Sequence, residues 1–114
     1  MTWLPTTWLL LVAYFFGGLF LTNAIPHLVS GMMGQPFQSP FAKPPGKGLS
    51  SSTVNVLWGF FNAVVGYLLV VQVGTFDLRS IPDAVALAFA ILLRSLLAAR
   101  RYGQFHGGNA PDRS

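Results

Sequence analysis

The residues best able to do chemistry in this sequence are an amide and a guanidinium, Asn62 and Arg94, each set within a long apolar stretch. A polar side chain inside a membrane is costly unless it finds a partner or reaches the interface. Arg94 precedes Arg101 by seven residues, about 10 Å along a helix, and Asn62 lies at nearly the same depth if its stretch crosses in the opposite direction. The first interpretation of Arg94 is snorkelling, in which its guanidinium extends along the helix to the headgroups. Otherwise we expect Arg94 to donate to the Asn62 carboxamide and, with Arg101, to bind an anionic lipid headgroup.

Small and polar residues recur around Asn62 at intervals of four, three and four, which places them on one face of a helix. They are Asn55, Gly59, Asn62 and Gly66. In membranes such residues mark contacts between helices, so this stripe is expected to face protein. Two interpretations stay open for the two amides. They hold helices together by interhelical hydrogen bonds, or Asn62 belongs to a polar site within the bilayer.

His27 is the other candidate for catalysis or metal binding, and Asn23 precedes it by one helical turn. No second histidine, cysteine or carboxylate lies near it at the spacing of metal ligands. A nucleophile with a base and an orienting acid is also missing, since the serines near Ser50 are typical helix caps. We predict no catalytic residue, metal or cofactor, and we expect His27 to be an interfacial residue that contacts lipid or a partner.

Three apolar runs position these side chains, and each is close to the ~20 residues that a helix needs to cross a bilayer. They cover residues 3–22, 54–73 and 81–99. With 53% hydrophobic and 9% charged residues, the 114-residue chain has too little polar surface for a soluble domain. We predict an all-α integral membrane protein with three transmembrane helices in a single domain, residues 1–103.

Cap residues predict where these helices begin and end. Hydroxyl residues 50–53 precede the second helix and Gly74 ends it. Ser80, Pro82 and Asp83 suit the first turn of the third helix. Gly103 is expected to stop that helix, which leaves residues 104–114 as a flexible polar tail.

The connection formed by residues 23–53 is predicted to be an ordered, Pro/Gly-rich loop at the membrane interface. Its first part resembles a short amphipathic turn after a bend at Pro26. Further on, Phe37 and Phe41 are expected to enter the membrane while Lys43 and Lys47 contact acidic headgroups. The loop is either structural, tying the first two helices together, or a docking face for a partner protein or a lipid.

Charge predicts the orientation of the chain. Five of the seven basic residues flank one side of the membrane if the first loop and the tail share it, whereas Arg79 stands between Asp77 and Asp83 on the other. The positive-inside rule then places the N-terminus outside and the C-terminus in the cytoplasm. A cleaved signal peptide is disfavoured because no basic residue precedes the first run. The scattered basic residues form no basic face, so no nucleic-acid partner is expected.

The loop sequence PFQSPFAKPPGKGLSS, preceded by NAIPHLVSGMMG and followed by VNVLWGFFNAVVGYLL, resembles a group of small uncharacterised bacterial integral membrane proteins. The likeness covers about the middle half of the chain. It implies a multi-pass protein of the bacterial inner (plasma) membrane with this loop as its signature. It implies no activity and no role for any residue.

These observations favour a small non-enzymatic membrane protein that acts by association, as a homo-oligomer or within a larger membrane complex. The first alternative is a small oligomeric transporter or channel, which would depend on the polar stripe at Asn55 and Asn62. Small multidrug exporters typically have four spans and a membrane glutamate, and this chain has neither. The second alternative is a protein that binds anionic membrane lipids through Arg94, the loop lysines and the loop phenylalanines.

Overall fold

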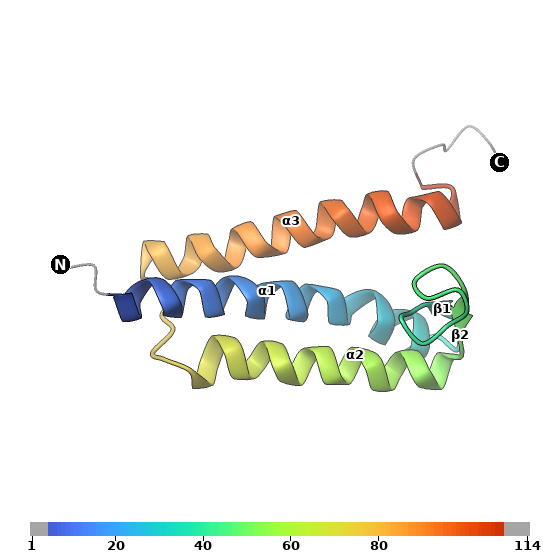
Figure 1. Cartoon of the computed structure of the whole chain (residues 1–114), viewed down its shortest axis with the longest axis horizontal. Helices are drawn as coiled ribbons and strands as arrows, with labels where there is room; N and C mark the ends of the chain where they lie inside the picture. The colour runs from blue at the N-terminus through green and yellow to red at the C-terminus, as the bar shows by residue number, and fades with distance from the viewer. Residues whose placement is uncertain (1–4, 109–114) are drawn as a thin grey trace.

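Three long apolar helices that could span a membrane make up most of the structure, a computed structural model that describes residues 5–108 (Figure 1). The predicted fold class is thereby confirmed. The elements, in chain order, are α1 (Pro5–Met32), β1 (Phe37–Gln38), β2 (Leu49–Ser50), α2 (Ser52–Tyr67), the π-helical turn η1 (Leu68–Gln72) and α3 (Ile81–His106). The two short strands pair antiparallel within the loop, with Phe37 opposite Ser50, and this small sheet was not expected.

The helices form one layer with α1 in the middle (Figure 1). α2 and α3 each pack mainly against α1, on different sides of it. The loop that carries β1 and β2 lies at the end of the layer where α1 ends, α2 begins and α3 ends. We call this the loop end of the bundle.

Glycines bring α2 close to α1. A Cβ atom added to Gly59 would lie 2.7 Å from Leu28 Cγ and 2.9 Å from the Leu28 backbone nitrogen, and one added to Gly66 would lie 2.9 Å from the Gly17 carbonyl oxygen. Backbone approach this close is how small residues stabilise helix pairs in membranes. On the other side of α1, Gly18 meets Ala90 of α3, whose side chain is fully buried.

α1 continues ten residues past Thr22, through Pro26 to Met32, so the predicted separate amphipathic turn is wrong. A proline removes one backbone hydrogen bond, which a membrane helix tolerates when neighbouring helices support it. That support is visible on the far side of Pro26, where Leu28 packs against Gly59 and Gly31 packs against Ser52. The loop therefore begins near residue 33 rather than at Asn23.

The helix caps agree with the sequence at two starts and differ at two ends. Ser51 accepts a hydrogen bond from the Val54 N–H, and Ser80 accepts one from the Asp83 N–H. α2 is followed directly by the π-helical turn, whose C-cap is Val73. The helix therefore ends one position before the predicted Gly74.

α3 passes Gly103 and ends at His106. Its C-cap, Gly107, adopts the left-handed conformation with φ 72°. Contacts of the last turn of α3 with the loop explain the extra residues, so 104–106 are helical rather than part of a tail. The predicted tail residues 109–114 lie outside the described part of the chain.

Candidate functional site

A chain of hydrogen bonds links all three helices at the depth of Arg94. Arg94 donates from Nη2 and Nε to Oδ1 of Asn23, at 2.7 and 3.2 Å. Asn23 in turn donates from Nδ2 to Oδ1 of Asn62 at 3.1 Å, and Asn62 donates to the Trp58 carbonyl at 2.8 Å. The guanidinium of α3 is thus held by α1, and the amide of α1 is held by α2.

The expected direct bond from Arg94 to Asn62 is therefore replaced by a relay through Asn23. The sequence placed Asn23 in the loop, because the first helix was expected to end at Thr22. With α1 continuous, Asn23 lies on a helix between the two side chains. Its position one turn before His27 was the available signal that both belong to one polar face.

A second polar cluster lies closer to the loop end, around His27 and Asn55. His27 is only 1% exposed and its Nδ1 lies 2.7 Å from Oδ1 of Asn55. The Asn55 amide nitrogen donates to the carbonyls of Phe37, Ser50 and Ser51, at 3.0 to 3.2 Å. Because that nitrogen is committed to acceptors, Asn55 Oδ1 accepts and Nδ1 of His27 carries the proton. Nε2 of His27 is left without a hydrogen-bond partner among residues 5–108.

The stripe residues Asn55, Gly59, Asn62 and Gly66 are the buried residues of α2. They contact α1 or the loop of the same chain, through the glycine contacts and the amide hydrogen bonds given above. On α3, Ala90 packs on Gly18 of α1. The stripe of α2 is therefore occupied within one molecule.

The loop closes over this cluster and binds the end of α3. Phe37 packs against Tyr102 and stacks on His106, with ring centroids 4.6 and 5.4 Å apart, while His106 Nε2 lies 3.0 Å from Gln38 Oε1. Phe37 is 9% exposed, so it faces protein and not lipid, contrary to the expectation from sequence.

The other loop residues singled out from sequence remain on the surface. Phe41 is 62% exposed and rests edge-on against Trp58. Lys43 and Lys47 are exposed. Backbone N–H groups of Lys47 and Gly48 both donate to the Pro44 carbonyl, which gives this part of the loop a fixed turn.

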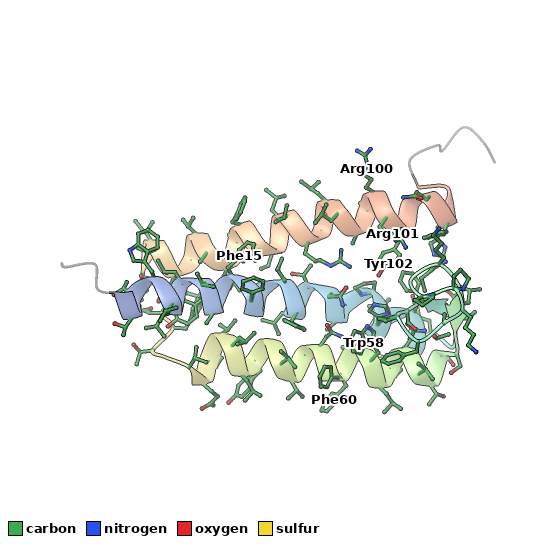
Figure 2. The ribbon with its side chains drawn as sticks, in the orientation of Figure 1. Phe15, Trp58, Phe60, Arg100, Arg101 and Tyr102 are labelled. Carbon is green, nitrogen blue, oxygen red and sulfur yellow. The ribbon has the colours of Figure 1, made fainter. Side chains whose placement is uncertain are left out.

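Between α1, the loop and α3 lies a pocket of about 380 Å³, which we call the arginine pocket. Its lining includes Asn23, His27, Ser39, Gly46, Arg94 and Arg101. Arg101 donates from Nη2 to the Gly46 carbonyl at 3.1 Å, and its guanidinium lies over the Phe105 ring. Figure 2 shows Arg101 and Tyr102 directed toward the loop and Arg100 directed away from the bundle.

The arginine pocket is lined by two cations and, among residues 5–108, by no acid that could act as a counter-ion. A guanidinium has five N–H donors; Arg101 uses one on Gly46 and Arg94 uses two on Asn23. Within the described residues the acids are Asp77 and Asp83, at the start of α3 and the opposite end of the bundle. Asp83 is about 27 Å along α3 from Arg101. The pocket thus combines two cations, spare donors and no nearby carboxylate, which suits an anion with several oxygens.

Among residues 5–108, no group of three His, Cys, Asp or Glu side chains could hold a metal ion. Comparison with known proteins found no matching family model, no matching curated protein and no matching solved structure. The fold and the site together define a multi-pass membrane protein with an arginine-lined pocket at one end of its helices.

Proposed function

We propose that this protein is a non-enzymatic membrane protein that binds an anionic lipid headgroup in the arginine pocket. The observation that carries the proposal is the convergence of Arg94 and Arg101 on one pocket whose lining, among residues 5–108, contains no acid. Arginine matches phosphate geometry through its planar fork, and bonds between ionised partners are about twice as strong as neutral ones. Ser39 and His27 add polar side chains to the same wall.

The setting at a membrane surface supports a lipid. The basic residues Lys43, Lys47, Arg100 and Arg101 all belong to the loop end. We propose that this end faces the cytoplasm of a bacterial cell from the inner membrane, with the N-terminus outside. Anionic lipids carry the surface charge that draws such basic segments to a membrane.

Orientation is tested by fusing reporters after Ser114. A fluorescent protein that matures only in the cytoplasm is expected to be bright there, and alkaline phosphatase fused at the same place is expected to be inactive. Both fusions at a second site in the connection of residues 74–79 should give the reverse result. Phosphatase activity at Ser114 would contradict the proposed orientation.

Headgroup binding is tested by replacing Arg101 with Gln and measuring phosphatidylglycerol retained by the purified full-length protein in native mass spectra. Retention is expected to weaken about tenfold, since a charge-assisted contact is worth roughly 1.5–3 kcal/mol. The matched control is Arg100→Gln, because Arg100 is the neighbouring cation but points away from the pocket (Figure 2). Equal losses in both variants would reduce the effect to general surface charge, and no loss in Arg101→Gln would refute the proposed site.

Association with itself or with a larger membrane complex stays a prediction of the sequence. The stripe of small and polar residues on α2 packs within the chain, so an oligomer would have to use the outer faces of α2 and α3. A transport pathway along Asn55 and Asn62 is also disfavoured. Both amides are hydrogen-bonded to α1, α2 or the loop, so neither is free to line a pore. The same native spectra give the stoichiometry of the purified protein.

A further inference from the structure

A second depression lies next to the arginine pocket, deeper along the helices. It has a volume of about 360 Å³ and is lined by Phe16, Leu19 and Phe20 of α1, with Asn62 of α2 and Arg94 of α3 beside them. We call it the apolar trough. Its walls are aromatic and aliphatic except at the end where Asn23, Asn62 and Arg94 meet.

The trough and the arginine pocket are adjacent, since Asn23 and Arg94 line both. Along α1 the residues Phe16, Phe20, Asn23 and His27 follow intervals of four, three and four, so they form one stripe on one face of the helix. Following this stripe toward the loop end, the surface changes from hydrocarbon to amide and then to cationic and imidazole groups.

We propose that this face of α1 seats a whole anionic phospholipid, with its phosphate in the arginine pocket and one acyl chain lying in the apolar trough. The inference rests on the proposed function and specifies its ligand. Charge complementarity fixes the phosphate at Arg101 and Arg94, and the order of polar and apolar groups fixes the direction of the chain. Asn23, at the junction, lies where the glycerol and ester groups of such a lipid would pass.

The trough is long enough to hold part of an acyl chain. Phe16 precedes Asn23 by seven residues, about 10 Å along α1. Arg101 follows Arg94, which bonds Asn23, by the same number of residues, so Phe16 lies about 20 Å from the level of Arg101. Because one leaflet contributes about 15 Å of hydrocarbon, an acyl chain in the trough reaches the middle of the bilayer near Phe20 and Phe16.

Blocking the trough separates this inference from binding of the headgroup alone. Leu19→Trp places an indole in the trough and is expected to lower retention of phosphatidylglycerol by about tenfold. The control is Ile25→Trp, which adds the same side chain to α1 at an exposed position two residues from Asn23 and so on the opposite face. Ile25→Trp is expected to retain the lipid as the unaltered protein does.

A measurement on the unaltered protein makes the test independent of how the variants fold. Phosphatidylglycerol carrying a photoreactive group near the end of one acyl chain is expected to cross-link to the peptide containing Phe16, Leu19 and Phe20. Soluble glycerol 3-phosphate is expected not to displace the lipid, and phosphatidylcholine with the same chains is expected to bind at least about tenfold more weakly.

The outcomes distinguish the two proposals. If glycerol 3-phosphate displaces the lipid and cross-links scatter over all three helices, the acyl seat is refuted while the arginine pocket stands as a site for a free phosphate. If Arg101→Gln leaves lipid retention unchanged, the proposed function fails and this inference fails with it. Equal retention by Leu19→Trp and Ile25→Trp, with cross-links outside the trough, overturns the inference alone.

Discussion

Replacing Gly59 with Leu is expected to separate α2 from α1 and to lower the free energy of unfolding by about 3 kcal/mol, the upper end of overpacking costs. Even the first added carbon would lie 2.9 Å from the Leu28 backbone nitrogen and 3.1 Å from the Ala24 carbonyl oxygen. Backbone atoms of a helix cannot yield as a side-chain tip can, so the helices themselves must move apart. Unfolding in mixed micelles with increasing SDS, followed by circular dichroism, measures the change.

The matched control for Gly59 is Val64→Leu, which adds a methylene to an exposed position of the same helix. It is expected to unfold within about 0.5 kcal/mol of the unaltered protein, as surface substitutions usually do. Equal stability of Gly59→Leu and Val64→Leu would contradict the close approach of α1 and α2.

Replacing Asn55 with Leu is expected to release the loop from the bundle. The substitution removes the partner of Nδ1 of His27 and the donor shared by three carbonyls, in a side chain that is 0% exposed. Each buried group left without a partner costs about 1–3 kcal/mol, so the expected loss is at least about 3 kcal/mol. Trypsin cleavage after Lys47 is expected to become faster, because β1 and β2, which flank the turn around Pro44, would no longer be tied to α2 through Phe37 and Ser50.

Asn62→Leu serves as the control for loop release. Asn62 is also buried in α2, but its amide bonds Asn23 and the Trp58 carbonyl and not the loop. This variant is expected to destabilise the helices while cleavage after Lys47 keeps its normal rate. Similar cleavage rates in both variants would show that Asn55 acts on general stability rather than on the loop.

Sequence reasoning was most successful where the signal is local. Helical periodicity alone identified the buried face of α2, because residues at intervals of three and four share a side of any helix. Hydroxyl residues before α2 and α3 predicted their first turns for the same reason. Long apolar runs predicted the three helices, since hydrocarbon selects for uninterrupted apolar residues.

The features that sequence reasoning missed depend on contacts between distant segments. The first apolar run ends at Thr22 and Pro26 follows soon after, so nothing local indicates that α1 stays helical to Met32, where Leu28 and Gly31 pack on α2. The early helix end placed Asn23 in the loop and hid its role between Arg94 and Asn62. Phe37 was likewise predicted to enter the membrane. The rings of Tyr102 and His106 that cover it are more than 60 residues away in sequence, so no local pattern indicates the contact.

The contribution of α3 to the loop end also sets an order of events during biosynthesis. α1, the loop and α2 emerge from the ribosome first, and they can pair through their glycines before α3 has been translated. Arg94, Arg101 and Tyr102 arrive last, so the arginine pocket is complete only when the third helix is in place. A nascent chain arrested before that point would leave Phe37 without the rings of Tyr102 and His106 that cover it.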